Sequence, residues 1–195
     1  MQQAQQADDG AAGGMEEPGI SRGEGLQAFQ VSLLARMEAA SSEELQARRL
    51  AVTIGETHCL IRLAEAGEIL PLSSLPIPTR VPLTQPWYLG LVNIRGNLVG
   101  IVDLAVLAGR DPQSRERGSR VLAFSPNLAP NCGLLLSSIL GLRHLSEMTQ
   151  VSSDEQKKID LLGVVERYRD REGTEWSEIG LATLLKESAF LHIGR

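Results

Sequence analysis

The spacing of apolar residues changes along the chain from a helical period to a strand period. Between residues 26 and 37 they recur every three or four positions, which places them on one face of a helix. These apolar residues are Leu26, Phe29, Leu33 and Met37. Ser41 and Glu44 form a capping pattern that predicts a second short helix through Arg48. Such a stripe usually packs on its own domain, and a helix that binds a partner is the alternative.

From residue 50 onward the period is two, which predicts strands. Residues 50–54 and 59–63 form a first hairpin, and residues 87–94 and 98–102 form a second around Arg95-Gly96-Asn97. Five of the nine prolines fall within residues 71–86, which predicts an extended connector. Further strands are predicted at residues 120–124, 133–140, 161–168 and 174–178. Short helices are predicted at residues 104–108, capped by Asp103, and at residues 181–187.

The chain also carries an internal repeat. An offset of 73 residues places Cys59 on Cys132, and an offset of 77 places Leu104 on Leu181 after a gap in a turn. The order of the matches indicates two copies of a unit with a hairpin, a strand, a hairpin and a short helix, which suits two small β-barrels packed together. In this alignment three polar residues have no equivalent in the second copy. They are Glu68, Asn93 and Arg95, which fall on Gly141, Glu166 and Glu172.

Composition restricts the class of protein. The 195 residues are 43% hydrophobic and carry a formal charge of -5. We interpret residues 1–25, which hold five acids and one arginine, as a disordered tail. No apolar run is long enough to span a membrane and no basic leader precedes one, so neither membrane insertion nor secretion is expected. A negative chain is not expected to bind nucleic acid, and two cysteines fit a cytoplasmic protein.

Residues that could carry chemistry are few. The three histidines have no partner at metal-ligand spacing, and the nucleotide-binding and serine-hydrolase motifs are absent, so we expect no metal, no cofactor and no catalysis. Four acids leave a carboxylate pair open as an alternative, namely Asp154, Glu155, Asp160 and Glu166. Two basic clusters, residues 115–120 and 167–171, are solvated loops or docking sites for an acidic protein surface.

Residues 87–104 read Trp-Tyr-Leu-Gly-Leu-Val-Asn-Ile-Arg-Gly-Asn-Leu-Val-Gly-Ile-Val-Asp-Leu. This sequence resembles the signature of the CheW family of chemotaxis coupling proteins: an apolar strand with glycine, then Asn-x-Arg-Gly, then an apolar strand ending in Asp-Leu. The resemblance covers roughly residues 49–190. The preceding helix, the hairpin with Trp176 and the ending at Phe190 are similar to the PilI branch of type IV pilus twitching motility.

The resemblance implies a mainly β fold of two pseudo-symmetric, five-stranded SH3-like barrels, with an added N-terminal helix over residues 26–48 and the CheW-like domain over residues 49–190. It implies no catalysis. Such proteins join the regulatory domain of a CheA-type histidine kinase to the cytoplasmic tip of a methyl-accepting chemoreceptor. Two alternatives stay open: a structural or assembly factor of a pilus without a kinase, and a small hydrolase whose acids converge in space.

The resemblance also implies a partner-binding set. Arg95 and Glu68 match family residues near the receptor-binding groove, and we expect a partly buried ion pair whose disruption would cost on the order of 3 kcal/mol. Gly90 and Ala66 match positions that line contact surfaces. The expected set is completed by Asn93 and Gly96 of the Asn-x-Arg-Gly motif.

Overall fold

The computed structural model describes residues 46–129, 131–151 and 161–195, which lie within one compact unit, Ser42–Arg195. The predicted tail, the predicted helix over residues 26–37 and the acids Asp154, Glu155 and Asp160 lie outside the described residues. The predicted second helix is corrected at its end, because Arg48 is already the first residue of a strand. The alternating apolar residues that follow Arg48 lie in the rest of this strand.

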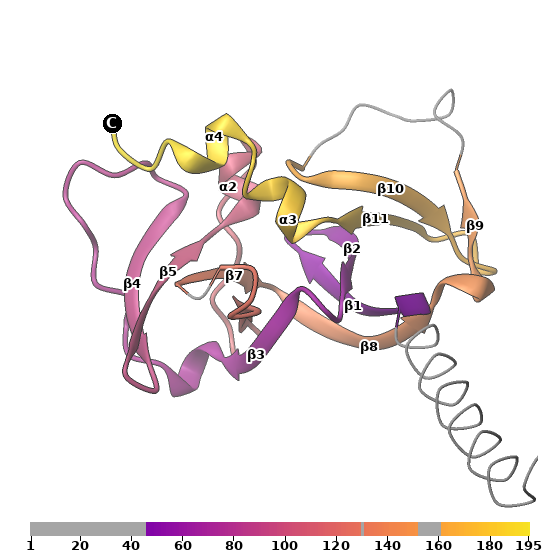
Figure 1. Cartoon of the computed structure of the whole chain (residues 1–195), viewed down its shortest axis with the longest axis horizontal. Helices are drawn as coiled ribbons and strands as arrows, with labels where there is room; N and C mark the ends of the chain where they lie inside the picture. The colour runs from indigo at the N-terminus through magenta and orange to yellow at the C-terminus, as the bar shows by residue number, and fades with distance from the viewer. Residues whose placement is uncertain (1–45, 130, 152–160) are drawn as a thin grey trace, which may run out of the picture. The chain divides into compact units, whose positions relative to one another are not determined.

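Two β-sheets form the unit, as the predicted fold class requires (Figure 1). One of them has six strands rather than the expected five, because a two-residue strand is added at its edge. The six-stranded sheet contains β1 (Arg48–Ile54), β2 (Thr57–Arg62), β8 (Ser138–His144), β9 (Thr149–Gln150), β10 (Val164–Arg169) and β11 (Glu175–Ile179). The five-stranded sheet contains β3 (Ala66–Pro71), β4 (Tyr88–Ile94), β5 (Asn97–Val102), β6 (Arg120–Phe124) and β7 (Cys132–Leu136). The α-helices described after β5 are single turns: α2 (Leu104–Leu107), α3 (Leu181–Leu184) and α4 (Ser188–Leu191). Two 3-10 turns, η1 (Leu72–Ser74) and η2 (Leu145–Glu147), follow β3 and β8.

The two copies of the repeat exchange strands. The six-stranded sheet runs β8-β1-β2-β11-β10-β9, and the five-stranded sheet runs β3-β6-β7-β5-β4. Replacing each strand of the second order by its counterpart in the other copy (β3 by β8, β6 by β1, β7 by β2, β5 by β11, β4 by β10) reproduces the first order up to β10. Each sheet therefore takes its first hairpin from one copy and its remaining strands from the other.

The strand registers confirm part of the repeat alignment and correct another part. Cys59 pairs in parallel with Ser177, and Cys132 pairs in parallel with Gly100, so the offsets of 73 and 77 both hold here. The offset of 73 fails in β10, because Asn93 lies opposite Leu98 whereas its counterpart opposite Glu175 is Arg169. The alignment of Asn93 with Glu166 is therefore wrong, because three of the four inserted residues lie ahead of β10 and only one lies in the turn.

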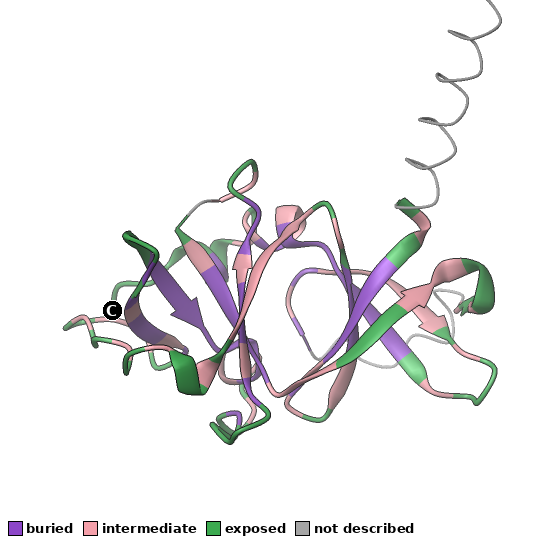
Figure 2. Cartoon of the chain, turned by 90° about the horizontal axis from the view of Figure 1, so that it is seen from below, coloured by how far each residue is buried: buried purple, intermediate pink, exposed green. Residues whose placement is uncertain are grey.

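The largest hydrophobic cluster joins the two sheets. Figure 2 marks buried stretches of both sheets in purple. Val52, Cys59 and Ile179 of one sheet and Leu122 and Leu134 of the other belong to this one cluster. Each sheet has a smaller cluster of its own, with seven buried residues in the five-stranded sheet and three in the six-stranded sheet. The six-stranded lobe therefore has less apolar material inside it.

Three predicted element boundaries are corrected. The strand expected over residues 133–140 is broken at Ser137, where the chain passes from β7 in one sheet to β8 in the other. The apolar run looks continuous because residues on both sides of the break pack against the core. The strand expected from residue 161 begins at Val164, after Gly163 at a φ of 78°. The last predicted helix ends at Leu184, and the unpredicted α4 follows it.

Candidate functional site

The second hairpin explains two residues of the Asn-x-Arg-Gly motif. Ile94 pairs with Asn97, so the loop consists of Arg95 and Gly96 alone, with φ angles of 51° and 89°. Positive φ at both central positions is the mark of a type I′ turn, whose twist matches that of the flanking strands. The Gly96 amide donates to Asn93 Oδ1 at 2.7 Å. Asn93 and Gly96 therefore stabilise the turn that carries Arg95.

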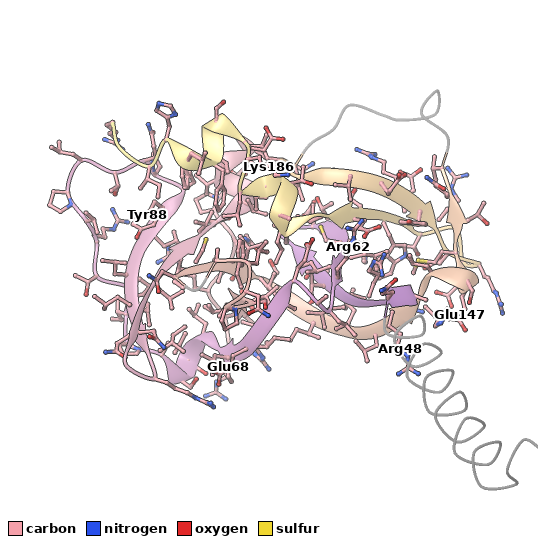
Figure 3. All side chains as sticks on the ribbon, in the orientation of Figure 1. Arg48, Arg62, Glu68, Tyr88, Glu147 and Lys186 are labelled. Atoms are coloured by element: carbon pink, nitrogen blue, oxygen red, sulfur yellow. The ribbon has the colours of Figure 1, made fainter. Side chains whose placement is uncertain are left out.

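Arg95 forms an ion pair across the two edges of the five-stranded sheet. Its Nη2 lies 2.7 Å from Oε1 of Glu68, which Figure 3 marks on β3. The Arg95 side chain is 79% exposed and that of Glu68 is 31% exposed. The expectation of a partly buried pair is thus corrected for the arginine, which projects from a two-residue turn. An exposed pair contributes about 1 kcal/mol or less to stability, well under the value expected for burial.

The Asp-Leu end of the signature has a structural role. Asp103 is fully buried and caps α2, because its Oδ1 accepts hydrogen bonds from the amides of Ala105 and Val106. The side chain and backbone amides of Gln113 also donate to the Asp103 carboxylate, at 2.9 and 3.0 Å. Four hydrogen bonds thus satisfy this buried carboxylate, so all the partners of Asp103 come from its own domain.

Gly90 is required by a close approach of the connector. The Thr79 amide donates to the Leu91 carbonyl at 2.8 Å, and the Leu91 amide donates back at 2.9 Å. A Cβ at Gly90 would lie 2.3 Å from the Thr79 carbonyl oxygen, and φ at Gly90 is 125°. The chain's own connector thus occupies the space over Gly90. Ala66 is half-buried, pairs with Phe124 and packs on the core between the sheets.

Of the six residues expected from the sequence, the structure thus brings Glu68, Asn93, Arg95 and Gly96 together at one hairpin tip. Gly90 lies under the connector and Ala66 on the core, and both are explained by packing within the domain. Arg95 remains as the residue whose identity neither the turn nor the core requires.

Sequence reasoning missed a buried ionic cluster in the six-stranded sheet. Glu178 of β11 is fully buried, and its Oε1 accepts from Nε of Arg49 at 3.0 Å and from Nε of Arg62 at 2.8 Å. The Arg49 side chain is 8% exposed and that of Arg62 is 47% exposed. The hydrogen bond that Arg62 donates to Glu178 raises the pKa of Arg62 above its ordinary value. Figure 3 labels Arg62 on this lobe.

The same positions are apolar in the other lobe. Arg49 pairs with Arg62 across β1 and β2 as Val121 pairs with Leu135 across β6 and β7. Glu178 pairs with Leu60 as Ile101 pairs with Gly133. Val121, Leu135 and Ile101 all belong to the cluster of the five-stranded sheet. The repeat offered the signal for the ionic cluster, because it aligns Arg62 with Leu135 and Glu178 with Ile101.

Other polar groups in the described residues serve local structure. Nδ1 of His144 caps η2 by accepting a hydrogen bond from the Ser146 amide, and Ser146 Oγ lies 2.6 Å from the same nitrogen. Burial raises the pKa of the Cys59 and Cys132 thiols to about 12. Within the described ranges, three or more His, Cys, Asp or Glu side chains nowhere converge as metal ligands would. No described helix is long and apolar enough to cross a membrane.

Comparisons with known proteins agree with the signature. A family profile described as CheW-like domain matches residues 48–179. Protein PilI of Pseudomonas aeruginosa is 30% identical over 82 residues, which are 42% of this chain and 44% of that protein. The chain thus matches less than half the length of this relative.

A solved structure supports the fold. The scaffolding protein TtCheW from Thermoanaerobacter tengcongensis superposes with a TM-score of 0.60 at 16% identity, over 74% of this chain and 95% of that one. The expected fold, with two β lobes and few helices, is confirmed. Since the family profile covers most of the sequence and the exchanged sheets carry the Asn-x-Arg-Gly hairpin, the chain belongs to the CheW-like domain family.

Proposed function

We propose that this chain is a non-enzymatic signalling adaptor. It couples a CheA-type histidine kinase to the cytoplasmic tip of a methyl-accepting chemoreceptor, in the control of twitching motility or chemotaxis. The membership of the CheW-like family and the similarity to PilI support this function. The cytoplasm is the compartment in which such coupling takes place.

One observation carries the proposed site. Asn93, Gly96 and Asp103 of the signature are satisfied within the domain, whereas Arg95 is held in a positive-φ conformation with its guanidinium largely in solvent. Glu68 holds that guanidinium in place across the sheet edges. A preorganised, exposed arginine suits recognition of a polar partner surface, because less conformational entropy is lost on binding.

Binding measurements test the function and the site separately. The full chain is mixed with the purified regulatory domain of a CheA-type kinase, and with the receptor tip, from the same genome. We expect both to bind, and we expect Arg95→Glu to weaken receptor binding by about tenfold while the unfolding free energy changes by less than about 1 kcal/mol. The matched control is Arg171→Glu, a charge reversal at another exposed hairpin tip.

The outcomes distinguish the competing functions. Failure to bind any kinase regulatory domain, with receptor or pilus components still bound, would favour the structural or assembly role. Binding of the receptor by Arg95→Glu as tightly as by the wild type would remove Arg95 from the site and leave the family assignment standing.

A further inference from the structure

The connector between β3 and β4 exposes large apolar side chains on an ordered backbone. Ile77 is 89% exposed and Leu83 is 80% exposed, the two highest values among the large exposed hydrophobic residues of the described chain. Both lie on the segment that is bridged to the edge strand β4 at Thr79 and Leu91. Side chains of this size that the fold does not bury are candidates for contact with another molecule.

The domain holds the connector at two points along its length. Thr79 is bridged to Leu91 of β4, and Thr84 is bridged to Gly194 near the end of the chain. The Leu83 carbonyl accepts from the Arg195 amide at 2.9 Å. Leu83 itself has a φ of 59°, a conformation that glycine and asparagine adopt far more readily than leucine. Leu83 therefore occupies a backbone conformation that favours another residue type, and its exposed side chain makes no buried contact that would explain the choice of leucine.

Two grooves follow the connector and meet at Leu89 and Arg115. The first has a volume of about 490 Å³ and is lined by Leu72, Leu75 and Ile77 as well as by these two residues. The second has a volume of about 530 Å³ and is lined by Leu83, Tyr88 and Val106 together with the same two. We call the two grooves together the connector surface. It shares no lining residue with the hairpin tip that carries Arg95.

The connector surface is basic although the whole chain is acidic. Arg80, Arg115 and Arg117 line it, and all three are exposed. Among the residues that line the grooves, Glu116 is the one acidic side chain, and its Oε1 accepts the hydroxyl of Ser114 at 2.8 Å. The first groove is mainly apolar and is edged by arginines, so it is complementary to a segment that carries both apolar and acidic side chains.

We propose that the connector surface docks an acidic amphipathic segment of a partner protein. The apolar side of that segment contacts Ile77 and Leu83, and its carboxylates pair with Arg115 and Arg117. The interaction goes beyond the proposed coupling function, because it needs neither the kinase nor the receptor and uses a different face from Arg95. It also gives a role to the basic cluster at residues 115–120.

Two peptides of matched apolar pattern test the proposal with the full chain. Both have 16 residues with leucines at positions i, i+3, i+4 and i+7, and the remaining positions are mostly Glu in one and Lys in the other. Fluorescence anisotropy is expected to show that the Glu peptide binds at least about tenfold more tightly than the Lys peptide, and that added salt weakens it. Amide NMR shifts of the labelled chain are expected to move at residues 72–89 and 115–117.

Three variants locate the binding. Arg115→Glu with Arg117→Glu is expected to lose about tenfold in affinity for the Glu peptide, as is Ile77→Ser with Leu83→Asn, whose side chains are exposed and not needed for folding. Arg171→Glu with Lys186→Glu makes the same charge change elsewhere on exposed residues and is expected to bind as the wild type. Circular dichroism confirms that each variant is folded.

Several results would overturn the proposal. These are equal binding of the two peptides, equal losses in the control and the arginine variants, shifts confined to other residues, or tighter binding of a DNA duplex or anionic vesicles through the same arginines. If the chain binds the kinase and the receptor but not the Glu peptide, the docking surface is wrong and the coupling function still stands. If it binds the Glu peptide but neither the kinase nor the receptor, the coupling function is wrong and the docking surface still stands.

Discussion

Arg95 and Leu83 are the two non-glycine residues with positive φ in the described part of the chain. A bulky side chain in this conformation costs on the order of 1 kcal/mol relative to glycine or asparagine. Neither residue recovers that cost by burial, because both side chains are largely exposed. The fold alone gives no reason for either identity, whereas the two proposed contact surfaces supply one.

Two glycines of the signature are required for different reasons, Gly90 by a close backbone contact and Gly96 by its backbone conformation alone. Gly90→Ala places a Cβ 2.3 Å from the Thr79 carbonyl oxygen at a φ of 125°, so the connector must detach from β4. Gly96→Ala has a φ of 89° but meets nothing within 4 Å. We expect unfolding free energies lowered by more than about 3 kcal/mol for Gly90→Ala and by about 1 kcal/mol for Gly96→Ala. Urea denaturation measures both, and similar losses would contradict the close approach at Gly90.

Asp170 makes the stability that it contributes at the β10–β11 hairpin depend on pH. The indole N–H of Trp176 donates to its Oδ2 at 2.9 Å, and the amides of Thr174 and Glu172 donate to Oδ1 at 2.8 and 3.0 Å. The bond from Trp176, with these amides, lowers the pKa of Asp170 below 3.8. A carboxyl whose pKa is lower when folded contributes stability that is complete above 3.8 and is lost as the pH falls through the folded value.

Asp170→Asn is therefore expected to melt at a lower temperature than the wild type at pH 7, with a gap that narrows once the pH falls below 3.8. Thermal melts across this range measure the gap. Glu172→Gln in the same turn is the control and is expected to show no such narrowing. A gap for Asp170→Asn that stays constant into acid would refute the assignment.

At the scale of elements, the lobes differ in what fills equivalent positions. Glu178 with Arg49 and Arg62 stands where Ile101, Val121 and Leu135 stand in the five-stranded lobe. A buried ionic group is often no more stable than apolar residues of similar size, whereas removal of one partner leaves a buried charge without compensation.

These facts predict opposite results for a single and a triple replacement. Glu178→Ala is expected to lower the unfolding free energy by about 3 kcal/mol or more, because the nearly buried Arg49 keeps its charge. Arg49→Val, Arg62→Leu and Glu178→Ile together reproduce the residues of the other lobe and are expected to restore at least wild-type stability. Urea denaturation compares them, and a triple variant less stable than Glu178→Ala would show that the cluster is needed for reasons other than charge balance.

The elements themselves were largely predictable, because each has a local cause. Alternation located β1, β2, β4 and β5, and the cap of α2 was evident from Asp103. Ser137 escaped detection because a strand that changes sheets keeps the same apolar character on both sides. The ionic cluster escaped because arginine and glutamate are predicted to be exposed, and only the repeat aligns them with buried residues.

The site was predictable in part for a similar reason. Asn-x-Arg-Gly identifies the turn, and the structure places Glu68 within 2.7 Å of Arg95 as expected. The exposure of Arg95 depends on how far a two-residue turn projects, which the sequence does not state. The connector surface depends on contacts far apart in the chain, such as Thr84 with Gly194, and these have no local pattern.

At the scale of the whole unit, the strand exchange makes the two repeat copies interdependent. The first hairpin, β1 and β2, is paired on one side with β8 and on the other with β11, both from the second copy. Reciprocally, β6 and β7 are paired with β3 and β5 of the first copy. A copy by itself would expose both edges of its first hairpin as well as the core cluster that both sheets share.

Cleavage in the exposed loop after Glu116 tests this interdependence. A cut at this position keeps the buried Gln113 in the same fragment as Asp103, to which it is hydrogen-bonded. The fragments 1–116 and 117–195 divide the domain at the boundary between its two repeat copies, and each lacks the strands that flank its own first hairpin. We expect each fragment alone to give the narrow amide NMR spectrum of an unfolded chain, and an equimolar mixture to recover the dispersed spectrum of the intact protein. If either fragment alone gave a dispersed spectrum and unfolded cooperatively, one copy could complete a sheet by itself. The strand exchange would then join two independently stable lobes and would not be a condition for folding.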